Sequence, residues 1–525
     1  MAEKLYNNIV LPDVWPPRYS DETLKKGQPV PYLENPPEVI DITLGRQLFV
    51  DEFLIKGHNC AFKFHRAKKY EGNPVLFPET VMEKYEKLPL ASPKGGGVWY
   101  DKDAKKYKMW YEAGWLHKNA YAESDDGIHW ERPNLHIVEG TNEILVDRKV
   151  NTPDDTPGFF RPDSTTVFID YDTDKADERY KLFMRNPGGD RMGLVAVSGD
   201  GIHFSKAKYT EIQGDRSTMF YNPFRKKWVY SIRCSFNGGR ARSYAECDDL
   251  LDGAKWGDTK VKWLCADESI KPNPYIQVAP NLYNFDAVAY ESIMLGMYEV
   301  YYGPENDVGF KTGAPKMTEL IPVFSRDGFH FSKPSNPAVV QASLMEGAWD
   351  RGYVQSVGGV CIVLKDEIRI YYSGVAGDES RGGTGNPKDC SNDTMYANGA
   401  CGFATIRRDG FVSIGTDEDG GVLTRKLTFK GTKKYMFINA QTAEDGVVRA
   451  EIRDKNNKTI VKSAPFTGDS TCAMLDFGDF DISSLENQEF CIRFGIGKAQ
   501  LYSFWFSEYE NGESGGYDGA GGKRD

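Results

Sequence analysis

A seven-residue motif, Ser-x-Asp-Gly-x-His-aromatic, occurs three times in this chain, at residues 124–130, 198–204 and 325–331. A degenerate copy stands at residues 408–411. Asp-Gly after a strand is strong turn chemistry, because glycine accepts a positive φ and the aspartate side chain bonds to nearby backbone. A unit that recurs in this way indicates a repeat architecture.

Each copy follows two strands that are joined by a turn. The second strands of five such pairs are expected at residues 107–111, 180–184, 228–232, 294–298 and 368–372. Aromatic residues make up 13% of the chain and glycines number 53, a composition that favours short strands and tight turns. The sequence therefore predicts an all-β fold with a five-bladed β-propeller over residues 41–415. An irregular β-sandwich is the alternative, but it does not explain five matching units.

Both flanks of the propeller differ from it in pattern. Residues 1–40 are rich in proline and charge and are expected to form an extended arm, followed by a first strand over residues 46–55. After about residue 420 the motif stops, and residues 423–429, 435–439, 447–452, 490–494 and 501–506 broadly alternate apolar and polar positions. This predicts a supporting β-sandwich over residues 420–510. The glycine-rich residues 511–525 are expected to be a flexible tail.

Composition excludes several classes of protein. The net charge of −11 argues against a nucleic-acid partner, whose phosphates require a basic surface. No stretch reaches the ~18 apolar residues of a membrane span, so no membrane partner is expected. Residues 1–22 lack the layout of a signal peptide, which leaves both a cytoplasmic location and export after removal of a signal open. The oligomeric state is open as well.

No cofactor is expected. The nine cysteines form no C-x-x-C pair and no metal-ligand spacing, and a disulfide between Cys390 and Cys401 is left open. Three of the seven histidines belong to the repeated motif and are interpreted as structural, so a catalytic zinc site is not predicted. A structural divalent cation in the propeller channel is left open. Residues 512–516 match the G-x-S-x-G motif of serine hydrolases, but they lie in the expected tail and no helix follows them, so the match is not interpreted as a catalytic site.

Carboxylates at equivalent positions of the repeat are the strongest sign of chemistry. Asp163, Asp215 and Asp286 stand where the innermost strands of three successive blades begin, so they are expected to converge at the mouth of the channel. Glycosidic cleavage needs one carboxylic acid to protonate the leaving oxygen and one carboxylate to activate water or attack carbon. Glu291 is a fourth catalytic candidate, although its spacing from Asp286 points the two side chains to opposite faces of a regular strand.

Basic, amide and aromatic residues near the same openings are predicted to bind substrate. Arginine holds hydroxyl or acidic groups by forked hydrogen bonds, and aromatic faces stack on sugar C–H surfaces. The candidates are Lys94, Arg161, Arg216, Arg240, Arg242, Tyr283 and Gln355.

At these residues the chain resembles the five-bladed propeller glycoside hydrolases, the broad group of families 32, 43, 117 and 130. More narrowly, it is similar to an uncharacterised family-32-like set from carbohydrate-degrading bacteria. The resemblance is carried by residues 45–55, 221–230, 324–331, 407–411 and 501–507. It implies a carbohydrate substrate.

The chain departs from family 32 at the start of the first blade. That family places its nucleophile in an Asn-Asp-Pro motif there, whereas residues 90–97 read Leu-Ala-Ser-Pro-Lys-Gly-Gly-Gly and hold no carboxylate. Asp51 is an alternative source of that carboxylate. The prediction is an exo-acting glycoside hydrolase on oligosaccharides, including acidic or sulfated ones, with inversion favoured over retention. A glycoside phosphorylase and a non-catalytic carbohydrate-binding propeller are the alternatives.

Overall fold

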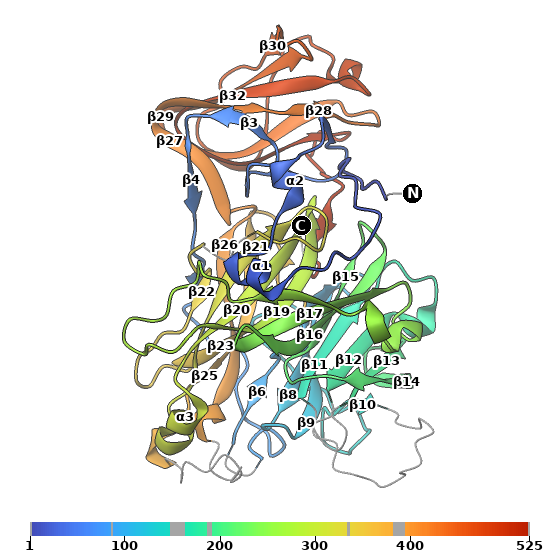
Figure 1. Ribbon diagram of the computed structural model, residues 1–525, viewed down its shortest axis with the longest axis vertical. Helices are drawn as coiled ribbons and strands as arrows, with labels where there is room; N and C mark the ends of the chain where they lie inside the picture. Colours follow the sequence, from blue (N-terminus) through green and yellow to red (C-terminus); the bar gives the residue numbers. More distant parts are fainter. Residues whose placement is uncertain are drawn as a thin grey trace.

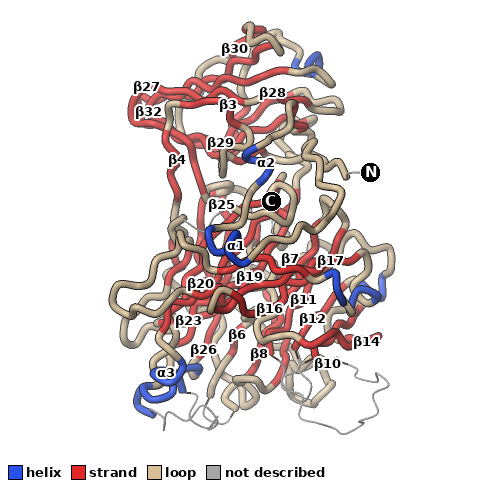
Figure 2. The backbone as a smooth tube through the Cα atoms, viewed as in Figure 1, coloured by secondary structure: helices blue, strands red, loops and turns tan. Residues whose placement is uncertain are grey.

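The computed structural model describes residues 3–85, 88–146, 163–185, 192–332, 336–381 and 394–522. Strands make up most of its regular structure. Of the short helices, α3 (Asn306–Thr312) lies at the lower edge of the view, and α1 (Asp21–Lys26) and α2 (Pro31–Glu34) lie near its middle (Figures 1 and 2). Within these ranges, no helix combines the length and the apolar character needed to cross a membrane.

Five sheets of four or five strands, counted over the described residues, form the lower body in Figure 1. Blade 1 holds β6 (Ala91–Ser92), β7 (Val98–Asp101), β8 (Lys106–Ala113) and β9 (Lys118–Ser124). Blade 2 holds β10 (Leu145–Val146), β11 (Asp163–Ile169), β12 (Tyr180–Arg185), β13 (Met192–Ser198) and β14 (His203–Ile212). Blade 3 holds β15 (Thr218–Asn222), β16 (Lys227–Phe236), β17 (Gly239–Cys247) and β18 (Val261–Cys265).

The remaining two blades each include a strand from a distant part of the chain. Blade 4 holds β19 (Asn281–Glu291), β20 (Ile293–Gly303), β21 (Met317–Ser325), β22 (Val340–Gln341) and, from the C-terminal end, β33 (Tyr517–Asp518). Blade 5 holds β23 (Gly352–Ser356), β24 (Ile362–Val363), β25 (Glu367–Val375), β26 (Gly399–Arg407) and, from the N-terminal end, β5 (Lys68–Lys69). The five predicted second strands are β8, β12, β16, β20 and β25, so the five-bladed propeller is confirmed.

The repeated motif forms one turn in each of its three complete copies. In the first copy, the Ser124 hydroxyl accepts a hydrogen bond from the Gly127 N–H at 2.9 Å, and Gly127 has a φ of 73°. The Asp126 carboxylate accepts from the backbone of Ile128 and His129 and contacts the His129 ring. The other two copies repeat these contacts. The motif histidines are therefore structural.

A separate unit, built of strands and one short 3-10 helix (η7, Ile482–Leu485) in its described part, lies above the propeller in Figure 1. Its strands are β1 (Val39–Asp41), β2 (Gln47–Leu48), β3 (Ile55–His58), β4 (Ala61–Phe64), β27 (Val412–Thr424), β28 (Lys426–Thr428), β29 (Tyr435–Asp454), β30 (Thr459–Lys462), β31 (Asp469–Met474) and β32 (Phe490–Ser507). They are hydrogen-bonded into one ten-stranded sheet around a separate apolar core. Several strands expected as separate pieces are joined in the long β29 and β32, and the sandwich stays a prediction.

Both chain ends differ from expectation. Residues 39–64 supply β1 to β4 to the C-terminal sheet rather than to a blade, and residues 46–55 do not form one strand, since β2 ends at Leu48. The glycine-rich C-terminal end is not a free tail, because its described part crosses three blades. Gly519 N–H donates to Ala289 of blade 4, Tyr100 N–H of blade 1 donates to Ala520, and Val363 N–H of blade 5 donates to Gly521. Residues 511–522 therefore form a strap across the propeller.

Candidate active site

The inner strands of the propeller begin side by side at one end of the channel. The Arg216 N–H donates to the Ser164 hydroxyl at 2.9 Å, which joins blades 2 and 3. The Arg242 guanidinium donates to the carbonyls of Arg216 and Tyr283, which joins blades 3 and 4. On the fifth blade, the Tyr353 N–H donates to the carbonyl of Lys316 on blade 4. These bonds bring the starts of blades 2 to 5 together.

In four blades, a residue at or near the start of the inner strand has a left-handed backbone conformation. The φ angles are 44° at Lys94, 56° at Ser164, 59° at Arg216 and 47° at Tyr353. Residues other than glycine rarely adopt this conformation, which costs of order 1–3 kcal/mol where it is held. Such strain clusters at functional sites, and here it recurs at one ring of positions in the channel.

Asp286 lies deep in this ring. Its side chain is 3% exposed and accepts hydrogen bonds from the Asn284 amide at 2.8 Å and from the Ser356 hydroxyl. Burial raises the pKa of the Asp286 carboxyl, and the opposing effects of Ser356 and Arg216 do not cancel that rise. Its other oxygen, Oδ1, has no partner among the described residues. Asp286 is thus suited to carry a proton.

Asp215 lies in the opposite electrostatic environment. Arg233 Nη1 is 3.0 Å from its Oδ1, and Arg240 Nη1 is 3.5 Å from its Oδ2. Burial raises the pKa of this carboxyl, but the cations led by Arg240 and Arg233 outweigh burial and hold it below its usual range. Asp215 is therefore suited to stay ionised.

Asp163 is the third predicted aspartate at this end of the channel. Its carboxylate forms an ion pair with Arg185 of blade 2 at 2.6 Å. The negative charges of Glu299, Asp286 and Asp163 together raise the pKa of the Arg216 guanidinium, so Asp163 lies close to Arg216. The structure therefore places Asp163, Asp215 and Asp286 at the same end of the channel, and their catalytic role stays a prediction.

Sequence reasoning missed the partners of these groups. Lys94 pairs with Glu112 at 2.7 Å, and Arg216 lies 3.4 Å from Glu299. Burial raises the pKa of both glutamates. The sequence does hold a signal for these partners. The residue directly after each predicted second strand has a polar or charged side chain that faces the channel end. These residues are Glu112, Arg185, Arg233, Glu299 and Ser373.

A buried lysine, also missed, completes the site. Lys316 is 2% exposed and donates to the Tyr283 hydroxyl at 2.8 Å. Its ammonium lies 4.9–5.9 Å from the ring centroids of Tyr283, Tyr301, Tyr353 and Tyr396. Burial raises the pKa of the Tyr283 phenol, but Lys316 and the nearby Arg240 outweigh it and hold the pKa below its usual value. Cation–π contacts of this kind stabilise a desolvated ammonium.

The predicted substrate-binding residues are placed as follows. Arg216, Arg240, Tyr283 and Lys94 all lie at the channel end, where Arg240 packs over the Tyr283 ring at 4.3 Å. Gln355 is fully buried, and both polar atoms of its amide lack a partner within the described chain. Arg242 instead ties backbone carbonyls together, so its role is structural. Arg161 lies outside the described residues.

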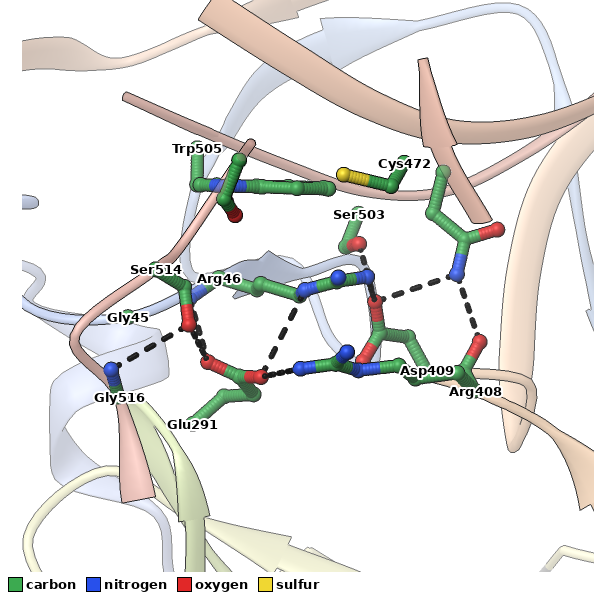
Figure 3. Close-up of polar contacts among 12 residues, drawn as sticks. Gly45, Arg46, Glu291, Arg408, Asp409, Cys472, Ser503, Trp505, Ser514 and Gly516 are labelled. Atoms are coloured by element: carbon green, nitrogen blue, oxygen red, sulfur yellow. Dashed lines mark hydrogen bonds and ion pairs between the residues drawn. The ribbon is translucent and has the colours of Figure 1, made fainter. Parts of the chain in front are cut away.

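Glu291 does not join this site. It is fully buried at the other end of β19, where its carboxylate pairs with Arg408 at 3.0 Å and Arg46 at 3.6 Å (Figure 3). The Ser514 hydroxyl of the strap donates to it at 2.7 Å, and Arg46 also pairs with Asp409 at 2.9 Å. Arg46 precedes β2 of the C-terminal sheet, so this network joins the two units. The degenerate motif at residues 408–411 thus serves as an anchor between them.

Two other expectations are answered by the same geometry. Asp51 is half-buried and pairs with Arg326 at 2.9 Å, so it does not supply a carboxylate to the channel mouth. Cys401 has a free, buried thiol, and its proposed partner Cys390 lies outside the described residues. Among the described side chains, no three His, Cys, Asp or Glu residues are grouped to hold a metal ion.

Comparison with known proteins gives structural likenesses only. The chain matches no protein-family model and no curated protein. A family 117 glycoside hydrolase of Zobellia galactanivorans is 12% identical, with a TM-score of 0.32, over 66% of this chain and 90% of its own. A β-1,2-mannobiose phosphorylase of Listeria innocua is 14% identical, with a TM-score of 0.39, over 64% and 96%.

A family 32 β-fructofuranosidase of Bombyx mori is 10% identical, with a TM-score of 0.34, over 83% of this chain and 93% of its own. Families 32 and 117 are among those that the sequence motifs resemble. At such low identities and TM-scores, the propeller assignment rests on the strand pairing described above.

Proposed function

We propose that this protein is a glycoside hydrolase, with Asp286 as the general acid and Asp215 as the general base. The observation that carries the proposal is the contrast between the two carboxyl groups. Burial favours the protonated form of Asp286, whereas Arg240 and Arg233 favour the ionised form of Asp215. Titratable groups whose environments push their pKa values apart are the expected acid and base of a hydrolytic site.

In this mechanism, Asp286 donates its proton to the glycosidic oxygen as the bond to the anomeric carbon breaks. Asp215 accepts a proton from a water molecule whose oxygen attacks that carbon from the opposite face, so the configuration inverts. The reaction leaves Asp286 ionised and Asp215 protonated, and exchange with solvent restores both. Asp163 sets the local charge through its ion pair with Arg185.

Side chains around these carboxylates suit a sugar. Gln355 offers a buried amide whose donors and acceptor are not engaged by described residues, and Arg216 has unpartnered N–H groups of the same kind. Buried polar atoms without partners are costly, so a polyhydroxylated ligand that satisfies them gains specificity. Exo action on oligosaccharides is part of this proposal.

The test is turnover of a broad oligosaccharide panel by the full chain and by Asp286→Asn and Asp215→Asn. Each substitution keeps the shape of the side chain but removes its acid–base function, so turnover should fall by at least ~100-fold. Asp248→Asn is the control, since Asp248 is an exposed aspartate whose one ion pair among the described residues is with Lys227 on the same blade. Wild-type turnover by a folded Asp286→Asn protein would refute the assignment.

A glycoside phosphorylase is the second candidate, because cationic side chains outnumber carboxyl groups among the described residues at this end of the channel. Turnover that requires inorganic phosphate and yields a sugar phosphate would identify it. Binding of oligosaccharides without release of product across the whole panel would instead identify a carbohydrate-binding propeller.

A further inference from the structure

A cavity opens between blades 2 and 3, beside the proposed base: Gly214, which precedes Asp215, and Arg233, which pairs with it, both line the cavity. Its volume is about 270 Å³, and it lies at the ends of β12 and β14 and along β16. Three cationic side chains line it, namely Arg185, Arg233 and Lys260. No aspartate or glutamate is among its lining residues.

One lining side chain has no partner within the described chain. Gln213 is 3% exposed, and both its amide nitrogen and its amide oxygen lack a hydrogen bond. Leaving a buried amide unpaired costs about 1–3 kcal/mol per group, so such a side chain in a folded protein calls for an explanation. A ligand in the adjoining cavity that accepts a hydrogen bond supplies one.

The charges of the cavity favour a negatively charged ligand. Arg185 and Arg233 contact Asp163 and Asp215 at 2.6 and 3.0 Å, whereas Lys260 has no ion pair with any described residue. The rest of the channel end adds five cationic side chains: Lys94, Arg216, Arg240, Arg242 and Lys316. The carboxyl groups there are Glu112, Asp163, Asp215, Asp286 and Glu299. Among the described residues, that makes eight cationic side chains against five carboxyl groups, and burial raises the pKa of three of these carboxyls.

This surplus stands out because the whole chain carries a net charge of −11. A local field opposite in sign to that of the protein attracts and retains ligands of the complementary charge. Guanidinium forks match the geometry of carboxylate and sulfate oxygens, and an ammonium adds a point charge.

We propose that this cavity is a subsite for an anionic substituent, a carboxylate or a sulfate ester, on the sugar bound at the proposed active site. Arg233 and Lys260 neutralise the substituent, and the Gln213 amide donates to it. The inference rests on the proposed function, because Arg233 contacts both the cavity and the proposed base Asp215.

The test measures binding of small probes to the full chain by saturation-transfer-difference NMR titration. The carboxylate probe is glucuronate, the sulfate probe is glucose 6-sulfate, and the neutral comparison is glucose. One of the anionic probes should bind at least about tenfold more tightly than glucose, which is the size expected for charged hydrogen bonds. The probe that binds more tightly identifies the substituent.

Two variants locate the binding. Lys260→Met and Gln213→Leu should each weaken binding of the anionic probe by about tenfold while leaving glucose binding unchanged. Lys227→Met is the matched control, since it also removes one lysine, at the far end of β16 and paired with Asp248. This control should bind both probes as the wild type does.

The outcomes separate this subsite from the proposed function. Equal binding of charged and neutral probes, or unchanged binding by both cavity variants, would overturn the subsite even if the protein hydrolyses a neutral glycan. Variant-sensitive binding of an anionic probe would support the subsite even if no glycoside is cleaved. Displacement of both sugars by inorganic phosphate, with no preference between charged and neutral sugar, would assign the cavity to phosphate and overturn the proposal.

Discussion

Glu291→Gln distinguishes a structural role of this carboxylate from a catalytic one. The substitution removes the negative charge between Arg46 and Arg408 and leaves both guanidinium groups with Asp409 as their buried counter-charge (Figure 3). Breaking a buried ion pair by removing one partner costs about 3–5 kcal/mol. Glutamine keeps one oxygen to accept from Ser514, so we expect the lower end, a loss of about 3 kcal/mol in the free energy of unfolding.

Urea unfolding followed by tryptophan fluorescence measures this loss, and Trp505 reports on it locally because Arg46 packs 3.9 Å from its ring centroid. Glu38→Gln is the control, since Glu38 is an exposed glutamate of the same region that pairs with Lys426. It should leave the unfolding midpoint unchanged. Turnover per folded molecule of Glu291→Gln should stay close to wild type. A stable variant with lost turnover would refute the structural role and return Glu291 to the catalytic candidates.

Three further outcomes are expected. The pH profile of kcat/KM should be bell-shaped. The pKa of its acid limb should lie below the ordinary range of an aspartate because Asp215 stays ionised, and the pKa of its alkaline limb should lie above that range because Asp286 stays protonated. Limbs at ordinary aspartate values would contradict the assignment. In an ultraviolet titration of tyrosinate, Tyr283→Phe should remove the earliest-ionising phenol and Lys316→Met should delay it, whereas identical early titrations would contradict the described contact. Deleting residues 511–525 should lower the thermal midpoint, because the strap bonds to three blades, and an unchanged midpoint would show that those bonds contribute nothing measurable.

The sequence was sufficient for the propeller because its signals are local. Each Asp-Gly turn and each buried second strand falls within a short window, and residues 107–111 or 368–372 can be recognised without knowledge of the rest. The convergence of the three aspartates followed from their equivalent positions in the repeat. Extending that alignment by one residue past each second strand would also have found Glu112 and Arg185.

Other features depend on contacts between distant segments and leave no local pattern. Nothing near Glu291 in the sequence indicates that Arg46 and Arg408 surround it. The left-handed conformations of Lys94 and Arg216 are equally hidden, because neither residue is a glycine or an asparagine. The glycine-rich composition predicted that residues 511–522 are mobile. Glycine content indicates flexibility only where tertiary hydrogen bonds are missing, and here such bonds hold the segment in place.

The placement of residues 39–69 has a consequence for how the chain matures during synthesis. Strands β1 to β4 pair with β27, β28 and β32, and β5 completes blade 5 by pairing with β26. The N-terminal strands are therefore synthesised long before the strands with which they pair. A growing chain emerges at about 5–20 residues per second, and pairing of segments far apart in sequence is slow. Neither unit can close on the ribosome before most of the chain has emerged. The exposed N-terminal strand edges make this a protein whose yield should depend on chaperones and on the rate of translation.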